Sequence, residues 1–222
     1  MSENINYREE LAAIREALKG ATKPYSNEVL ENMENGMYCC ALLAEKILQE
    51  QRGQYEIGPL AKELLDYGTI LEGYDHLLNC VQRSAERMAD ALPGHPRLKV
   101  KLLRLRLLAL RRIECIQDHE ISITEDIMAE ISELERNIAA ADRGKLDQIK
   151  GSGMLKSDPV EWTARYEEVI DEVEKIVDAR LADHPRGMGF CFAYWHELAD
   201  VLSDYGIDWR SPSRMNPGVM FD

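Results

Sequence analysis

An unbroken apolar seam in the middle of the chain constrains the fold more than any other feature. Between Leu60 and Leu92, apolar residues recur at steps that alternate between four and three. This spacing keeps one helix face against a partner helix, as in a coiled coil or a long bundle. Because Pro59 suits the first position of a helix, we predict one helix from Pro59 to Leu92, roughly 50 Å long. The seam residues are Leu60, Leu64, Tyr67, Leu71, Tyr74, Leu78, Val81, Ala85, Met88 and Leu92.

Two glycines, Gly68 and Gly73, lie inside this predicted helix. Each costs about 1 kcal/mol in a helix interior. We therefore expect each glycine either to allow the close approach of a neighbouring helix or to mark a bend.

Other segments carry the same helical periodicity, and none shows the sustained alternation of a half-buried strand. Asn6 is placed to cap the first of these segments, and Ser26 is placed to cap the second. Together the patterns predict an all-α protein, an antiparallel bundle of about six to seven long, coiled-coil-like helices with an aromatic-rich irregular C-terminal tail. The further predicted helices cover residues 7–18, 27–52, 97–117, 122–141, 159–176 and 189–205.

Breaks in the pattern divide the chain into two helical parts. We expect residues 1–142 to form the main helical bundle. Residues 143–156 contain Gly144 and further glycines and are typical of a linker. Residues 157–222 are expected to form a C-terminal helical segment and docking tail, which either packs on the bundle as one domain or stays apart.

The composition is that of an acidic globular protein. The formal net charge is −13, which repels nucleic acid and anionic membranes unless positive charge is concentrated locally. The odd count of five cysteines, without a Cys-x-x-Cys pair, favours a reducing compartment. The polar start MSENINYREEL is unlike a signal peptide, and arginines interrupt the most apolar window, residues 98–113. We therefore expect a cytoplasmic protein that contacts no membrane.

Residues 97–112 carry seven positive charges and no acid, whereas residues 114–142 carry nine acids and one base. Two such helices are expected to fold back on each other and compensate their charges. Lys99 and Arg106 differ from the other basic residues, because a helical wheel places them inside the apolar arc. A charge there needs a partner, which is either an acid on a packed helix or a bound anion or partner carboxylate. Lys99 and Arg106 are therefore the candidate anion-binding or partner-binding residues.

Four acids form a spaced pattern, with Glu31-x-x-Glu34 followed by Glu63-x-x-Asp66 after 28 intervening residues. The pattern resembles the acidic motif of the all-α nucleotide pyrophosphohydrolases of the MazG type. The resemblance implies that Glu31, Glu34, Glu63 and Asp66 hold Mg²⁺, a hard cation that prefers oxygen ligands. The doubled glutamate of that family is absent here, and Asp66 points away from the apolar seam. A Mg²⁺-dependent nucleotide or phosphoester hydrolase is accordingly the alternative function; otherwise no cofactor is expected.

The last 36 residues differ in composition from the rest of the chain. All three phenylalanines and two of the three tryptophans lie after residue 186. Irregular chain rich in Trp, Arg, Met and Pro is typical of a docking segment. The same residues could instead fold back and cap the helices. The candidate docking residues are Trp209, Arg210, Met215 and Phe221.

The leading hypothesis is a non-catalytic helical scaffold or protein-interaction protein, because the seams are sustained and no catalytic constellation is coherent. The tail resembles those of bacterial and phage-borne proteins, so we expect a phage-borne or mobile-element-borne chain in a bacterial cytoplasm. A protein partner or a second copy of the chain is the expected partner. The alternatives are the Mg²⁺-dependent hydrolase and a nucleic-acid or anion-binding module that uses residues 97–112.

Overall fold

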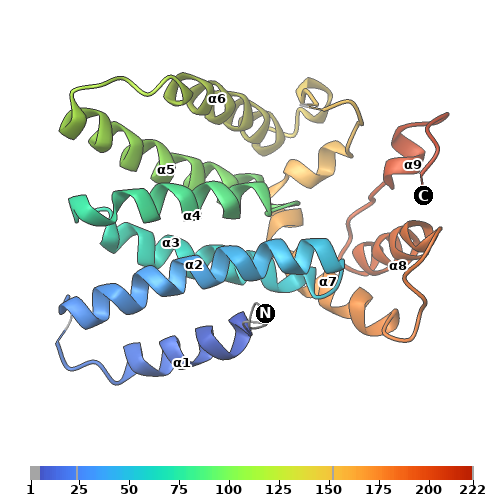
Figure 1. The fold of residues 1–222 in the computed structure, drawn as a ribbon. Coiled ribbons are helices and arrows are strands. Elements are labelled where there is room, and N and C mark those ends of the chain that lie inside the picture. The colour runs from blue at the N-terminus through green and yellow to red at the C-terminus, as the bar shows by residue number, and fades with distance from the viewer. Residues whose placement is uncertain (1–5, 24, 152, 222) are drawn as a thin grey trace. The chain divides into compact units, whose positions relative to one another are not determined.

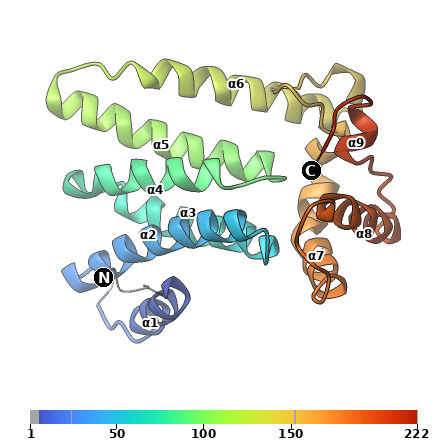
Figure 2. The same ribbon diagram turned by 45° about the vertical axis from the view of Figure 1, so that its right-hand side comes forward.

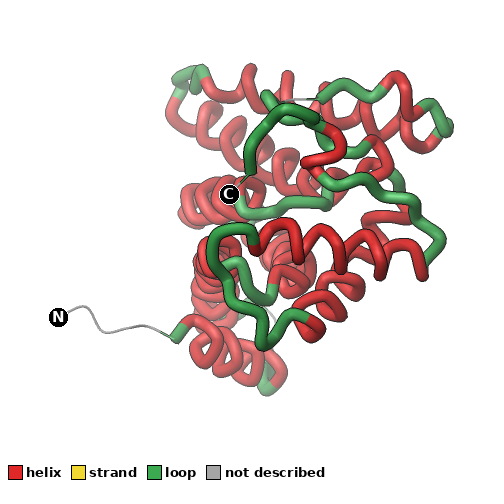
Figure 3. The backbone as a smooth tube through the Cα atoms, turned by 90° about the vertical axis from the view of Figure 1, so that its right-hand side faces the viewer, coloured by secondary structure: helices red, strands yellow, loops and turns green. Residues whose placement is uncertain are grey.

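The structure, a computed structural model, describes residues 6–23, 25–151 and 153–221. All regular elements in these residues are helical, which confirms the all-α class (Figure 3). The helices of the described part are each too short or too polar to cross a membrane. The chain divides into two compact units. Among the described residues, the first unit lies within 6–51, 56–93 and 98–132, and the second lies within 52–55, 94–97 and 133–221.

The first unit holds the N-terminal helices (Figure 1). Ser26 caps the second of them, as predicted, by accepting a hydrogen bond from the backbone N–H of Val29 at 3.3 Å. Asn6 precedes the first helix but makes no such side-chain bond. Wholly within the first unit are α1 (Tyr7–Lys19), α2 (Asn27–Glu50), α3 (Ile57–Leu71), α4 (Leu78–Asp90) and the 3₁₀ turn η2 (Asp75–Leu77). It also contains most of α5 (Pro96–Gln117) and the first half of α6 (Ile123–Asp142), whereas residues 96–97 and 133–142 of these helices, and most of the 3₁₀ turn η1 (Gln54–Glu56), belong to the second unit.

The prediction of one helix from Pro59 to Leu92 is wrong. The chain leaves the helix after Leu71, and Tyr74 has an extended backbone with φ −117° and ψ 113°. Arg112 of α5 holds this turn, because its guanidinium donates to the Glu72 carbonyl and pairs with Asp75. The two halves, α3 and α4, contact each other, and both pack on α2 (Figures 1 and 2). The apolar seam is continuous because both α3 and α4 turn their apolar residues toward α2. The longest helix is therefore not the predicted one but α2, with 24 residues.

Of the two glycines between Pro59 and Leu92, Gly68 allows the close approach of neighbouring helices and Gly73 marks a break, the two roles expected from the sequence. A Cβ atom at Gly68 would lie 2.5 Å from Cδ2 of Leu105 and 3.2 Å from Cε of Met37. Gly68 therefore allows the close approach of α5 and α2 to α3. Gly73 lies at the break between α3 and α4, where a helix-breaking residue favours the turn.

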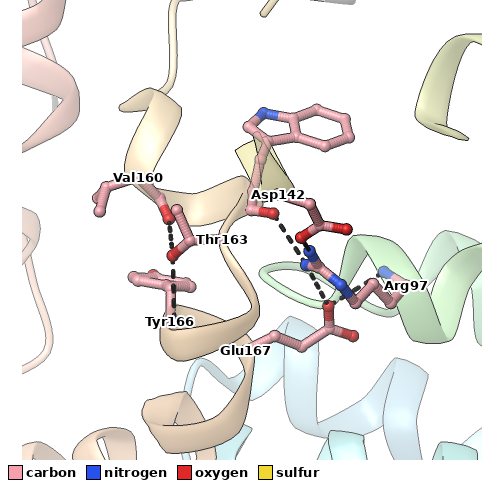
Figure 4. Close-up of polar contacts among 7 residues, drawn as sticks. Arg97, Asp142, Val160, Thr163, Tyr166 and Glu167 are labelled. Atoms are coloured by element: carbon pink, nitrogen blue, oxygen red, sulfur yellow. Dashed lines mark hydrogen bonds and ion pairs between the residues drawn. The ribbon is translucent and has the colours of Figure 1, made fainter. Parts of the chain in front are cut away.

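The second unit is built on α7 (Ala164–Arg180) and α8 (Phe190–Asp204), which pack against each other. The predicted opening of a helix at Pro159 is corrected, because Pro159 begins only the 3₁₀ turn η4 (Pro159–Trp162). Thr163 then caps α7: its hydroxyl accepts from the Tyr166 N–H at 3.2 Å and donates to the Val160 carbonyl at 2.7 Å (Figure 4). Asp158 caps η4 in a similar way, because its carboxylate accepts a hydrogen bond from the Val160 N–H at 3.1 Å. Two successive caps thus divide what the sequence pattern presents as one helix.

Residues on either side of the predicted linker are tied down within the second unit. The Asn137 side chain, fully buried, exchanges two hydrogen bonds with the backbone of Lys150, at 2.8 and 3.1 Å. Asn216 does the same with the backbone of Lys156, at 2.8 Å for both bonds. These asparagines hold the irregular chain around η3 (Leu146–Gln148) and the tail around α9 (Pro212–Met215).

Candidate interaction sites

Lys99 and Arg106 both find acids on neighbouring helices. The Lys99 ammonium lies 2.9 Å from a carboxylate oxygen of Glu130 on α6, and Arg106 pairs with Glu86 on α4. The Arg106 side chain is only 14% exposed. The structure therefore shows the first of the two expected kinds of partner. An external anion would have to compete with these carboxylates, so binding at Lys99 and Arg106 stays a prediction.

The four acids of the predicted metal motif lie on α2 and α3. Glu63 is held by Arg15, whose Nε and Nη2 donate to it at 2.9 and 2.5 Å, and by the Tyr67 hydroxyl at 2.7 Å. Burial raises the pKa of Glu63, but the hydrogen bonds from Arg15 and Tyr67 outweigh burial and lower it. Glu31 and Asp66 are exposed. Among the described residues, His, Cys, Asp and Glu form no group with metal-binding geometry.

The candidate docking residues of the tail pack within the second unit. Trp209 is 5% exposed, and its indole N–H donates to Glu161 at 2.7 Å. The Arg210 backbone N–H donates to the buried carboxylate of Asp158 at 2.8 Å. Met215 and Phe221 are half-buried, and the Phe221 ring stands edge-on to Trp195, with 5.1 Å between centroids. A docking role of the tail stays a prediction.

Arg97, the first basic residue of α5, joins three elements of the second unit (Figure 4). Its guanidinium donates to the Trp162 carbonyl at 2.8 Å and pairs with Asp142 at the end of α6. Its backbone N–H donates to Glu167 of α7 at 3.1 Å. Since these partners come from α6, η4 and α7, Arg97 is a structural clamp.

A cluster of ionisable residues formed by His95, α7 and α8 escaped the sequence analysis. His95 is 4% exposed, and its Nε2 lies 2.9 Å from a carboxylate oxygen of Asp171. Glu174, one turn further along α7, accepts a hydrogen bond from the Tyr194 hydroxyl at 3.3 Å. Burial raises the pKa of Glu174 to about 7, helped by the Asp171 charge and opposed by His95 and by the Tyr194 hydrogen bond. The available sequence signal was the position of Glu174, four residues after Ile170 and three before Val177, both buried.

The hairpin formed by α5 and α6 leaves several large apolar side chains in solvent. Ile116 is 57% exposed, Leu108 46% and Met128 44%. Leu108, Arg111 and Cys115 follow each other along one side of α5, and the Arg111 guanidinium lies 2.9 Å from the Met128 sulfur of α6. The two helices therefore contribute to one surface, which we call the hairpin face. Its apolar residues, which lie beside Arg111 on α5 and at its contact on α6, are Leu108, Cys115 and Met128.

Unpaired charges of both signs accompany the hairpin face. Lys101 and Arg111, on the same side of α5 as Leu108, form no ion pair with any residue in the described part of the chain. The same holds for Glu125 and Asp126 in the first turn of α6. Glu114 fixes the connection between the helices by accepting a hydrogen bond from the Ile121 N–H at 2.7 Å. The hairpin face is therefore partly apolar. It carries unpaired basic residues on α5 and unpaired acidic residues on α6.

Comparisons with known proteins do not add to this geometry. No protein-family model, no curated protein and no solved structure matches the chain.

Proposed function

We propose that the protein is a non-catalytic scaffold, built as an antiparallel helical bundle, that self-associates through the hairpin face. The observation that carries the proposal is the exposure of large apolar side chains on two adjacent helices of the first unit. A soluble chain exposes single apolar residues routinely, but a group on one fixed surface is typical of an interaction site.

The charges of the hairpin face favour a second copy as the partner. A two-fold interface uses the same patch on both subunits, so a basic flank on one copy meets an acidic flank on the other. Lys101 and Arg111 supply the basic flank, and Glu125 and Asp126 supply the acidic one. A partner of a single charge sign would be attracted by one flank and repelled by the other.

The alternatives receive less support from the geometry. A Mg²⁺ site would need Glu63, which Arg15 already holds with two of its donor nitrogens, Nε and Nη2. A nucleic-acid interface would need the basic residues of α5, of which Lys99, Arg106 and Arg112 are paired with carboxylates.

The test replaces one residue at the centre of the proposed contact. A half-exposed Leu gains about half of the 1.5–3 kcal/mol of full burial, or about 1 kcal/mol. The change Leu108→Asp removes this from both copies, so we expect the dimer dissociation constant to rise at least about thirty-fold, equivalent to about 2 kcal/mol. Analytical ultracentrifugation over a concentration series measures this constant.

The matched control is Leu155→Asp, because Leu155 is 49% exposed and lies in the second unit. It should leave the dissociation constant unchanged, and circular dichroism should show that both variants keep their helix content. Equal effects of the two changes, or none from Leu108→Asp, would reject the hairpin face as the interface.

A further inference from the structure

A pocket of about 160 Å³ lies in the second unit, between α8 and the chain that follows it. Aromatic rings of Phe192, Trp195 and Trp209 line it, together with the imidazole of His196 and the guanidinium of Arg214. Ser211 and Ser213 add hydroxyl groups, which lie 2.9 Å apart. The pocket thus combines flat apolar walls with groups that bind anions. It is separate from the hairpin face, so this inference does not depend on the proposed self-association.

The aromatic walls are held in place by a hydrogen bond and by ring-to-ring contacts. The Trp209 indole is buried and donates to Glu161 at 2.7 Å. The Trp195 ring stands edge-on to Phe192 and to Phe221, with centroids 5.5 and 5.1 Å apart and interplanar angles of 82° and 89°. Rings fixed in this way need no reordering when a flat ligand enters, which lowers the entropic cost of binding.

The positive charge of the pocket is not neutralised by the second unit. Within the described residues, the side chains of Arg214 and His196 form neither an ion pair nor a hydrogen bond. The nearby carboxylates already have partners. Glu197 and Asp200 of α8 both pair with Arg180, at 3.0 and 2.7 Å. The Arg214 guanidinium therefore lies beside aromatic rings without pairing with a carboxylate of the described residues, although the chain as a whole is acidic.

These features specify the ligand by chemistry. A guanidinium binds a carboxylate through two parallel hydrogen bonds, and indole and phenyl rings pack on a flat aromatic ring edge-on or offset-stacked. The volume is below the roughly 300 Å³ at which pockets for drug-sized molecules begin, so a single ring fits better than a fused or linked pair. We propose that this pocket binds a small aromatic carboxylate, with its ring against Trp195 and Trp209 and its carboxylate on Arg214.

The test uses phenylacetate as the probe and isothermal titration calorimetry of the 222-residue chain as the measurement. Phenylacetate should bind with a dissociation constant on the order of 1 mM, as expected for about ten non-hydrogen atoms. Cyclohexylacetate keeps the charge but lacks the aromatic face, and phenylacetamide keeps the ring but lacks the charge. We expect both to bind at least about fivefold more weakly, because each removes one of the two recognised features.

The protein variants test the location. Arg214→Gln removes the charge from an exposed side chain and should weaken phenylacetate binding at least about tenfold. Arg165→Gln, on the exposed side of α7, is the matched control and should bind like the unaltered chain. Indole N–H signals of Trp195 and Trp209 in ¹H–¹⁵N spectra should shift on titration, while that of Trp162 should not. Absence of binding at about 10 mM phenylacetate, or equal binding by Arg214→Gln, would overturn the proposal.

Discussion

The sharpest consequence for stability concerns the partly buried carboxyl of Glu174. Burial raises its pKa from 4.5 to about 7 in the folded protein, whereas the unfolded chain leaves it in water. The folded state therefore binds the proton more tightly than the unfolded state does, and deprotonation disfavours folding. Since a tenfold change in proton affinity corresponds to about 1.4 kcal/mol, raising the pKa from 4.5 to about 7 costs about 3 kcal/mol once both states are ionised.

The direction of the pH dependence follows from this shift. Below pH 4.5 the Glu174 carboxyl is protonated in both the folded and the unfolded state, so it does not lower the free energy of unfolding. As the pH rises from 4.5 to about 7, the carboxyl lowers the free energy of unfolding more and more. A glutamine has a similar shape and no charge, and its amide can still accept the Tyr194 hydrogen bond. Glu174→Gln should therefore raise the free energy of unfolding by about 2–3 kcal/mol at pH 8 and by about 1 kcal/mol or less at pH 5.

Urea unfolding followed by tryptophan fluorescence measures this difference. All three tryptophans, Trp162, Trp195 and Trp209, lie in the second unit, so the signal reports the unit that contains Glu174. Glu168→Gln is the control, because Glu168 is on the same helix but its side chain is 67% exposed. It should change the free energy by less than about 0.5 kcal/mol at either pH. An equal effect of Glu174→Gln at pH 5 and pH 8, or a loss of stability at pH 8, would refute the reasoning.

Two further predictions concern packing and the polar clamp of the second unit. Gly68→Ala forces a methyl group against Leu105, so it should lower the thermal unfolding midpoint at a net cost of about 1–2 kcal/mol in the free energy of unfolding. In Gly73→Ala the added Cβ meets only a carbonyl oxygen at 3.3 Å. This change should leave the free energy of unfolding the same within about 1 kcal/mol. Equal loss from the two changes would contradict this assignment. Arg97→Ala should lower the free energy of unfolding of the second unit, measured in urea, by about 2–3 kcal/mol, because it removes the guanidinium that pairs with the Glu167 carboxylate. A decrease below about 0.5 kcal/mol would show that the clamp is dispensable.

The sequence predicted most helix boundaries because caps and stops are local signals. Ser26 and the change of pattern near Gln117 place their helix ends within a residue or two. The break at Tyr74 was missed because a four–three spacing describes only which face is apolar. The spacing of apolar residues is the same in one long helix and in two short helices that pack on a common partner, as α3 and α4 do on α2. For the same reason the spacing could not distinguish the close approach at Gly68 from the turn at Gly73.

The candidate sites were less predictable, because they depend on contacts between distant residues. The helical wheel identified Lys99 and Arg106 as charges in need of partners, but it could not name Glu130 or Glu86. Composition identified the aromatic tail, but not that Trp209 is buried beside α8 and forms a pocket wall.

Sedimentation of the unaltered chain tests the central proposal most directly. The chain mass is 25.4 kDa. If the hairpin face joins two copies, the weight-average mass should rise with concentration toward twice this value, and added salt should weaken association because the flanking charges are exposed. A constant 25.4 kDa up to about 1 mM, where an association of only about 4 kcal/mol would already appear, would contradict self-association.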